Sequence, residues 1–354
     1  MKRHFQSLSL ALALAFGLSG CGTLPFGTPG AAVDSKATAL KRASGQLSVL
    51  VFPEAGPKSL IDAVRGAKKS IELETYMFTN HDASEDLIQA LVARAKAGVD
   101  VRVILEANPY IPPQVGQPLP ENPNKATTAE LLAGGVKVKR SSPKFRFTHE
   151  KGMVIDGDTA YIMTLNFTNS GLSGNREYVV VDRDQSDVDE LQRIFHADWE
   201  ELTYVPKDPD LVVSPNNSRQ KILQLIDSAK KSVVVQIEFL SDPEVAQHLG
   251  ARAQAGVDVK VMGAFYEPDP VTGRDTCGDT TKLLNGVGVT NVRFSKTLKM
   301  HAKMIAVDGE RAYVGSENLT SNSLDNNREV GIILQDKTLV GTLMQTAAKD
   351  WDQR

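Results

Sequence analysis

Cysteine is the residue type that the sequence most clearly lacks. The 354-residue chain has two cysteines, Cys21 and Cys277, too few for a disulfide framework. No group of cysteines and histidines has the spacing of a zinc site, so we expect neither a structural nor a catalytic metal. The hydrophobic share of 41% and the charged share of 23% are ordinary for a globular protein. The length allows one large domain or two medium ones.

An excess of positive charge is also missing. The chain has 40 lysines and arginines against 43 aspartates and glutamates, a formal net charge of −3. Loss of residues 1–20 would remove Lys2 and Arg3 and no acidic residue, which gives −3 − 2 = −5. A negative domain is a poor match for the phosphate backbone of nucleic acids. Nucleic acid is therefore not expected as a partner.

The apolar run near the N-terminus, from about residue 8 to residue 18, is too short to span a bilayer. Two basic residues precede it and small residues follow it, which is the order of a secretory signal. The segment Leu18-Ser19-Gly20-Cys21 resembles the lipobox of bacterial lipoproteins, in which the cysteine becomes the lipidated first residue. A plain signal peptide with an incidental Cys21 is the alternative.

We accordingly expect residues 1–20 to be a lipoprotein signal peptide and residues 21–44 to be a flexible tether, because the latter are rich in Gly, Pro, Thr and Ala. Gly22 stands where an inner-membrane retention signal would have aspartate. The expected location is the bacterial cell envelope, with the anchor in the outer membrane or in the outer face of the cytoplasmic membrane.

Beyond the tether the sequence repeats itself. Residues 67–71 read AKKSI and residues 229–233 read AKKSV, and from His149 onward the two copies stay 152 residues apart. A repeat unit of about 150 residues is a duplicated domain and not a solenoid. The expected boundaries are 45–205 for the first copy and 206–354 for the second.

Within each copy, helical and strand periods alternate. Residues 58–67 and 84–97 have apolar positions at helical spacing, and residues 99–105 form a β-branched strand pattern. This alternation predicts α/β layers with the sheet inside. Long irregular stretches at 108–125 and 266–282 follow matching strands, so they are either functional rims or two unrelated surface loops.

A paired motif carries the chemistry. Each copy has a histidine, a lysine two residues later and an aspartate five residues after that: His149-Lys151-Asp156 and His301-Lys303-Asp308. Turn residues and a second apolar run follow each motif, which predicts a hairpin. On a strand the histidine and the lysine point to the same face. An imidazole and an ammonium on one face form a site for an oxyanion and a proton-transfer group.

Two further pairs keep the same offset. Asn166 and Asn318 follow the histidines by seventeen residues, and Glu177 and Glu329 follow them by twenty-eight. A carboxylate that accepts from one imidazole nitrogen would fix the tautomer and favour the charged ring. The asparagine amides would donate to a phosphoryl oxygen.

These residues resemble the phospholipase D superfamily, the H-x-K-x4-D proteins, over nearly all of the chain beyond the tether. The second copy also has the following G-S-x-N element, residues 315–318. The first copy departs from it with Met163-Thr164-Leu165-Asn166, which puts its backbone geometry in doubt. The resemblance implies two packed mixed sheets flanked by helices, with one active site at a pseudo-two-fold interface.

The resemblance also implies a mechanism without metal or other cofactor. One histidine attacks phosphorus and the other protonates the leaving alcohol. Family precedent favours His149 as the nucleophile, although the residues do not distinguish it from His301. Lys151, Lys303 and the two asparagines would bind the non-bridging oxygens. Asp156 and Asp308 complete the catalytic motifs, yet in the family they are more structural than catalytic.

Three functions share this machinery. A lipid hydrolase is expected first, because a lipid anchor would hold the enzyme, as a monomer, at a phospholipid surface. A phosphatidyltransferase of the cardiolipin synthase kind is second, and a nuclease is third because of the negative charge. A degenerate binding module is disfavoured by two intact motifs.

The remaining reactive side chains are expected to be uninvolved. His81, His196 and His248 have no partner in the repeat, and Cys277 is a lone thiol in an expected loop. Basic residues gather upstream of each motif, which is either positive potential focused on the site or an ordinary solvated face. They are Lys137, Lys139, Arg140, Lys144, Arg146, Arg293, Lys296 and Lys299.

Overall fold

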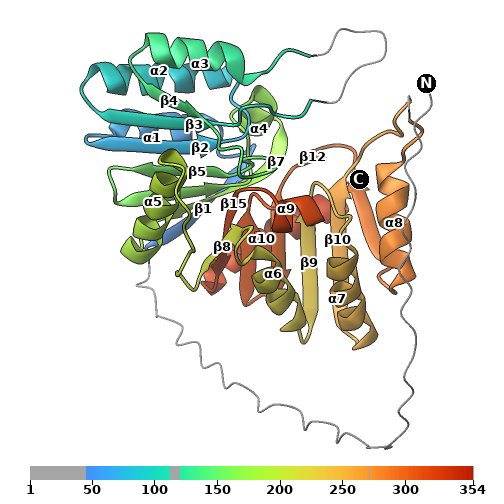
Figure 1. The fold of residues 1–354 in the computed structure, drawn as a ribbon. Helices are drawn as coiled ribbons and strands as arrows, with labels where there is room; N and C mark the ends of the chain where they lie inside the picture. Colours follow the sequence, from blue (N-terminus) through green and yellow to red (C-terminus); the bar gives the residue numbers. More distant parts are fainter. Residues whose placement is uncertain (1–44, 112–119, 271, 354) are drawn as a thin grey trace, which may run out of the picture. The chain divides into compact units, whose positions relative to one another are not determined.

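The structure, a computed structural model, describes residues 45–111, 120–270 and 272–353 (Figure 1). The expected signal peptide and tether, with Cys21, lie outside the described residues. Among the helices that are described, none combines the length and the apolar character needed to cross a membrane.

The first sheet has eight strands in the order β4-β3-β2-β5-β6-β7-β1, with the short strand β12 (Lys299–Met300) added beside β7. Strands β2, β3 and β4 are parallel, and the others on this path are antiparallel, so the sheet is mixed. Its other strands are β1 (Leu47–Phe52), β2 (Ser70–Thr75), β3 (Asp100–Leu105), β4 (Lys137–Arg140), β5 (Lys151–Ile155), β6 (Thr159–Met163) and β7 (Asn175–Asp182).

The second sheet has seven strands in the order β11-β10-β9-β13-β14-β15-β8, which repeats the first order strand for strand. Its parallel and antiparallel pairs also repeat those of the first sheet. The duplication in the sequence is therefore a duplication of topology. The strands are β8 (Leu211–Ser214), β9 (Ser232–Ile237), β10 (Asp258–Ala264), β11 (Asn291–Ser295), β13 (Lys303–Val307), β14 (Arg311–Gly315) and β15 (Glu329–Leu334).

Helices cover the sheets in two different ways. In each half, the first helices pack on the outer face of the sheet through their apolar stripes. They are α1 and α2 in the first half and α6 and α7 in the second. The last helix of each half instead joins the core between the two sheets. The helices are α1 (Lys58–Gly66), α2 (Ala83–Lys96), α3 (Asn124–Ala133), α4 (Asn169–Ser173), α5 (Gln185–Trp199), α6 (Ser218–Asp227), α7 (Pro243–Gln254), α8 (Thr276–Gly286), α9 (Ser321–Asp325) and α10 (Lys337–Asp352).

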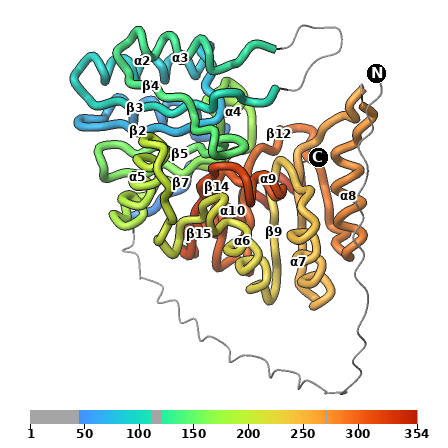
Figure 2. The backbone as a smooth tube through the Cα atoms, viewed as in Figure 1, coloured from blue at the N-terminus to red at the C-terminus, as the bar shows by residue number. Residues whose placement is uncertain are grey.

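The starts of α5 and α10 show how local sequence repeats local structure. The side chains of Asp184 and Asp336, 152 residues apart in the sequence, cap these helices by accepting backbone N–H groups of the first turn. Apolar residues of both helices belong to one buried cluster that also contains strand residues of both sheets. The paths of the two helices can be followed in Figure 2. The two halves consequently share one buried interface, as the fold prediction required.

Two local predictions need correction. The second expected loop, 266–282, is helical from Thr276 onward, so Cys277 lies in the first turn of α8 and not in a loop. The sequence suggests Gly157-Asp158 and Gly309-Glu310 as the hairpin turns after the motifs, which is one residue too late. Asp156 and Gly157, both with positive φ (57° and 71°), are the central residues of the first turn, which is the geometry of a type I′ turn.

Candidate active site

The two halves are joined where each motif begins. Strand β12, just before His301, pairs in parallel with the start of β7, and Thr148 forms the matching bridge to Arg328 at the start of β15. The backbone N–H of His149 donates to the Arg328 carbonyl at 2.8 Å, and that of His301 donates to the Arg176 carbonyl at 3.2 Å. Each histidine is thereby fixed against the other half of the molecule.

This exchange determines which carboxylate meets which histidine. Glu329 Oε2 lies 2.7 Å from His149 Nδ1, and Glu177 Oε1 lies 2.7 Å from His301 Nδ1. The spacing of the motifs predicted a glutamate for each imidazole, and the structure adds that the pairs are crossed between the halves. Crossing was not visible in the sequence, because a repeat does not reveal which copies exchange partners.

Each half has an Asn-Arg-Glu triplet at the start of β7 or β15, and the three side chains make the same kinds of contact in both halves. In the second triplet, Asn327 Nδ2 donates to Glu329 at 3.0 Å, while Arg328 pairs with the buried Asp198. The first triplet repeats this with Asn175, Glu177 and Arg176, whose partner is Asp350. Both glutamates are fully buried, so these neighbours hold them in place for the histidines.

The two histidines open onto one cavity of about 410 Å³. Asn166 and Asn318 also line it, as the phosphate-binding prediction required of them. Burial lowers the pKa of His149 to about 4, because desolvation outweighs the opposing charge of Glu329. His149 is therefore neutral at pH 7, with Nδ1–H directed to the carboxylate and Nε2 free to carry a lone pair.

The two motif lysines lie beside their histidines and are almost completely buried. Lys151 Nζ donates to the His149 carbonyl at 2.6 Å, and Lys303 Nζ donates to the His301 carbonyl at 2.7 Å. Burial lowers the pKa of Lys151 to about 7, so its charge is sensitive to anything that binds nearby. An anionic oxygen would stabilise the charged ammonium.

The motif aspartates lie at the other end of their strands and do not line the cavity. Asp156 accepts the backbone N–H groups of residues 68–70 at 2.6–3.1 Å, and Asp308 does the same for residues 230–232. Their inclusion among the catalytic residues is therefore not supported by the geometry. Each one holds the hairpin turn to the loop before β2 or β9.

Sequence reasoning missed several cavity residues, among them Tyr76, Glu238 and Tyr266. Glu238 is the most consequential, because its carboxylate, on a side chain that is 10% exposed, lies 3.1 Å from Lys303 Nζ. It directly follows β9, where the matching residue after β2 is Tyr76. The 162-residue offset of the AKKS segments would have aligned these two positions, but neither residue type belongs to the motif.

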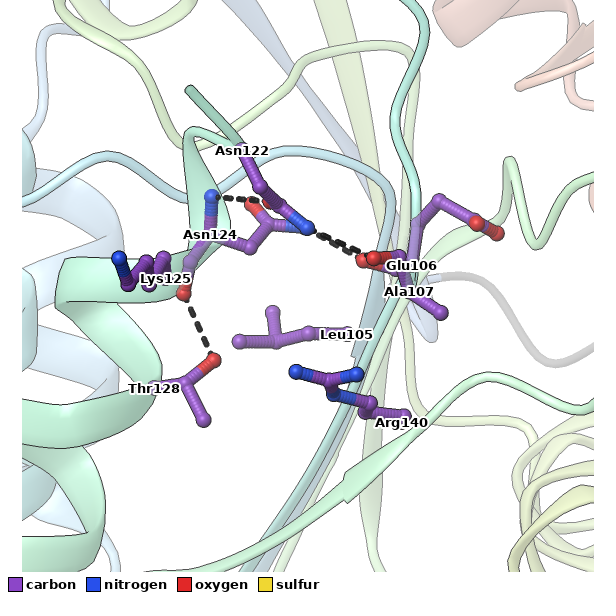
Figure 3. A pocket seen from close by; sticks show the side chains of 8 residues that line it. All are labelled: Leu105, Glu106, Ala107, Asn122, Asn124, Lys125, Thr128 and Arg140. Carbon is purple, nitrogen blue, oxygen red and sulfur yellow. Dashed lines mark hydrogen bonds between the residues drawn. The ribbon is translucent and has the colours of Figure 1, made fainter.

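A second, smaller cavity of about 120 Å³ is lined by residues at the end of β3, at the start of α3 and at the end of β4 (Figure 3). Asn124, in its wall, accepts from the Phe78 N–H at 2.8 Å and donates to the carbonyls of Tyr76 and Glu106 at 2.8 and 2.9 Å. Asn122 donates to the Ala107 carbonyl at 2.6 Å. These amides brace the loop ends next to the active-site cavity.

Other candidates lie away from the cavity. Among the basic residues upstream of the motifs, Lys299 lines it, whereas others such as Lys137, paired with Asp100, and Arg293, stacked on Trp351, do not. The expectation of focused positive potential is thus supported at one position. The three unmatched histidines sit beside carboxylates outside the lining, namely His81 with Asp82, His196 with Glu72 and His248 with Asp227.

Two groups of three carboxyl residues in the described part of the chain are close enough to share a cation, and neither lines the cavity. The first group is fully buried and includes Glu150, the residue between the motif histidine and lysine. These groups are Glu74, Glu150 and Asp198, and Asp187, Asp208 and Asp210.

Residues 60–199 and 222–351 match the family model described as "Cardiolipin synthase, PLD-like domain". The chain therefore belongs to this family of the phospholipase D superfamily, and the duplicated fold with its shared interface is the fold of that superfamily. The family membership confirms what the paired motifs predicted.

Among curated proteins, the chain is 28% identical to a cardiolipin synthase of Geobacillus thermodenitrificans over 82% of its own length and 63% of that protein. It is 27% identical to the major cardiolipin synthase ClsA of Bacillus subtilis over 82% of its own length and 66% of that protein. The chain thus spans about two thirds of the length of these relatives.

Solved structures show the same fold. A phosphatidylserine synthase from Haemophilus influenzae superposes with a TM-score of 0.63 at 14% identity, covering 88% of this chain and 87% of that one. A polyphosphate kinase from Porphyromonas gingivalis gives a TM-score of 0.63 at 17% identity, covering 85% of this chain and 50% of that one. At these identities the likeness concerns the fold alone.

Proposed function

We propose that the protein transfers a phosphatidyl group from a phospholipid to an alcohol through a covalent phosphohistidine. The observation that carries this proposal is the pair of histidines on one cavity, each with Nδ1 held by a buried glutamate of the other half. With Nδ1 occupied, Nε2 is the nitrogen left for chemistry at phosphorus. The asparagines at the same cavity would donate to the non-bridging oxygens.

The reaction has two balanced steps. In the first, the lone pair of one imidazole forms a P–N bond, the P–O bond to the leaving alcohol breaks, and the other imidazole supplies the proton to the leaving oxygen. In the second, that imidazole takes the proton of the incoming alcohol, whose oxygen attacks phosphorus as the P–N bond breaks. No metal or other cofactor is required in either step.

Transfer replaces hydrolysis as the first choice. The sequence alone favoured a lipid hydrolase, whereas the family model and the curated relatives carry the name of cardiolipin synthase. Water remains a competing acceptor, because a phosphohistidine is open to either hydroxyl compound. A nuclease stays the third choice, since the mature charge of −5 (−3 − 2) opposes binding to a polyanion.

The location belongs to the same proposal. A chain lipidated at Cys21 and tethered through residues 21–44 would hold a monomeric enzyme of two domains, 45–205 and 206–354, at a phospholipid surface. Cys21→Ser should release the protein from the membrane fraction, and a clickable fatty acid should label the wild type alone. Equal labelling of both forms would exclude Cys21 as the acylation site.

Product analysis tests the reaction. The purified full-length protein is incubated with vesicles of phosphatidylglycerol and phosphatidylcholine, with and without added glycerol, and the lipids are identified by mass spectrometry. We expect products in which a phosphatidyl group has moved to an alcohol, and we expect none with His301→Ala. Phosphatidic acid as the sole product at every glycerol concentration would identify a hydrolase. Cleavage of DNA without turnover of lipid would identify a nuclease.

A further inference from the structure

The two sides of the cavity differ in charge at a matched position. Glu238 directly follows β9, and Tyr76 directly follows β2, the corresponding strand of the first half. Both side chains line the cavity. Both sides have the motif histidine and lysine, the asparagine and the crossed glutamate. The position of Glu238 and Tyr76 therefore distinguishes two sides that are otherwise similar.

Glu238 contacts the groups expected to hold phosphate in the second half. Its Oε2 lies 3.1 Å from His301 Nε2 and 3.1 Å from Lys303 Nζ. Asn318 Nδ2 approaches the same oxygen at 3.4 Å, and the Tyr266 hydroxyl donates to Oε1 at 2.9 Å. One negatively charged oxygen therefore takes the place that a non-bridging phosphoryl oxygen would need among these donors.

The side chain is an anion at neutral pH. Burial opposes its ionisation, but the charges of His301 and Lys303 outweigh burial and hold the pKa of Glu238 far below its ordinary range. A phosphodiester, itself an anion, would meet a like charge on this side of the cavity.

The first half offers the opposite situation. Tyr76 stands in place of the glutamate, its hydroxyl accepts from the Tyr110 N–H at 2.7 Å, and its ring meets the His149 ring edge-on with 4.6 Å between centroids. The Lys151 ammonium lies 5.5 Å from the centre of the Tyr76 ring. Of the cavity-lining residues that the structure describes, no carboxylate other than Glu238 is present, so Asn166 is open to an anionic oxygen.

Glu238 also distinguishes the two imidazoles. His301 has a carboxylate at each ring nitrogen, Glu177 at Nδ1 (2.7 Å) and Glu238 at Nε2 (3.1 Å). Only an imidazolium carries N–H on both nitrogens and can donate to both carboxylates. His149 has a carboxylate at Nδ1, from Glu329, and is neutral at pH 7 for the reason given above.

A positive charge also acts on His301, that of Lys303, and the carboxylate of Glu238 offsets it. Lys303 Nζ lies 3.2 Å from Nδ1 and 3.3 Å from Nε2, so its positive charge opposes an imidazolium. Glu238 bridges both cations. The charged or titratable groups in contact with the ring are Glu177 from β7, Glu238 after β9 and Lys303 from β13. The other titratable residues of the same cavity are His149, Lys299, Tyr76, Tyr110 and Tyr266.

We propose that Glu238 is a positioning residue that makes the shared site one-sided. Its carboxylate occupies the position in the second half where an anionic oxygen would bind, so the phosphoryl group binds against His149 and Asn166. His301 then serves as the proton donor to the leaving oxygen. His149 Nε2 then forms the P–N bond while the leaving oxygen takes the proton from His301 Nε2. This inference rests on the proposed function and supplies what the repeated motifs do not, a reason why one histidine should attack.

The test locates the phosphohistidine. Full-length wild type, Glu238→Gln and the control Glu267→Gln are mixed with bis(p-nitrophenyl) phosphate, quenched and analysed by peptide mass spectrometry. Glu267 is exposed one residue beyond Tyr266, so its variant removes the same charge outside the cavity lining. A p-nitrophenolate leaves without a proton, so either histidine can form an adduct with this substrate. We expect the adduct on His149 alone in the wild type and the control, and on both histidines in Glu238→Gln.

Two further readouts separate positioning from a merely structural role. Inorganic phosphate should inhibit Glu238→Gln about tenfold more tightly than the wild type, because a like charge has left an anion position. The alkaline limb of the pH profile of kcat/KM should move to lower pH in Glu238→Gln, because the proton donor has lost a carboxylate. Glu238→Asp should restore part of both properties.

The outcomes distinguish this inference from the function on which it rests. An adduct on His301 in the wild type would overturn the role of Glu238 and leave the transferase proposal intact. The same conclusion would follow if Glu238→Gln changed neither the distribution of the adduct between the two histidines nor the inhibition by phosphate. If no variant formed an adduct on either histidine while the diester was cleaved, the phosphohistidine mechanism would fail and the inference with it.

Discussion

The two halves have the same topology, yet different side chains surround their buried charged groups. The arginine of each Asn-Arg-Glu triplet forms a salt bridge with an aspartate near the end of the other half's last helix. Arg176 pairs with Asp350 of α10, and Arg328 pairs with Asp198 of α5. Two neighbours of this pair differ between the halves. The first half has Glu74 and Glu150, where the second half has Gln236 and Ala302.

In the second half, hydrogen bonds satisfy the amide of Gln236, which stands in place of Glu74. Gln236 Nε2 donates to Asp350 at 2.9 Å, and the Tyr178 hydroxyl donates to Gln236 Oε1 at 2.5 Å. In the first half, both carboxyl oxygens of Glu74 and one of Glu150 have no donor among the described residues. Burial, and next the charge of Asp198, raises the pKa of Glu74 well above its ordinary value and that of Glu150 to about 8.

The difference shows that a repeated scaffold does not require repeated charge balance. The second half neutralises its cluster with an amide and an aliphatic residue, and the first half does so with protons held on two carboxyl groups. Combined with Glu238, which is present in the second half alone, this gives two sides of one active site with distinct electrostatics. The predictions that follow test that distinction.

The largest effect should come from the histidines. His149→Ala and His301→Ala should each lower turnover of phospholipid by about 10³-fold or more, because neither imidazole can both attack and protonate. Bis(p-nitrophenyl) phosphate should separate them: His301→Ala should release one burst of p-nitrophenol per active site, and His149→Ala should release none. The burst is measured by stopped-flow absorbance. Substantial lipid turnover by either variant would sink the shared-site model.

The crossed glutamates should have the next largest effect. Glu329→Gln and Glu177→Gln should lower kcat by about 10–100-fold each while leaving the fold intact, because each orients a histidine of the other half. The crossing predicts that Glu329→Gln diminishes the burst of His301→Ala, whereas Glu177→Gln leaves that burst nearly unchanged. The reverse pattern would show that each glutamate serves the histidine of its own half.

Much of this arrangement was open to prediction from the sequence. The repeat fixed which residues correspond, and the strand spacing placed His149 and Lys151 on one face. The duplicated fold and the paired histidines and asparagines of the cavity followed from these features. Two features could not be predicted. The crossing of Glu177 and Glu329 depends on a two-residue strand, β12, that is too short to leave a periodic signal. The role of Glu238 depends on tertiary contacts that bring three donors to one carboxyl oxygen.

Stability should respond to pH with opposite signs at two carboxyl groups of the first half, Glu150 and Glu54. A carboxyl group whose pKa is raised from 4.5 to about 8, as for Glu150, keeps a proton in the folded state that the unfolded chain releases. Its favourable contribution is complete below pH 4.5 and is lost as the pH rises through 8. Glu150→Gln should therefore be more stable than the wild type by about 1–3 kcal/mol at pH 9, with a smaller difference at pH 5.

Glu54 supplies the matched control. The hydrogen bond from Arg176 lowers the pKa of this half-exposed carboxyl, so its contribution is present above pH 4.5 and lost as the pH falls. Glu54→Gln should be slightly less stable than the wild type at pH 8, and the difference should shrink on acidification. Urea unfolding at pH 5, 7 and 9 measures both variants. A Glu150→Gln difference that does not change with pH would mean that Glu150 is ionised in the fold.

The smallest effect should be that of a chelator. Glu74, Glu150 and Asp198 can bring three oxygens within 4.8 Å of one another, so protons and a divalent cation would compete for the same cluster. Because the raised pKa values favour protons, excess EDTA should leave the melting temperature unchanged, in the wild type and in Glu150→Gln alike. Cleavage of a soluble phosphodiester should also survive EDTA, since two imidazoles and two lysines need no metal to bind phosphate or to activate an alcohol. A calcium-dependent rise in the melting temperature of the wild type that Glu150→Gln abolishes would show that a cation, and not protons, balances the first half. Complete loss of diester cleavage in EDTA, restored by added metal, would refute the two-histidine mechanism itself.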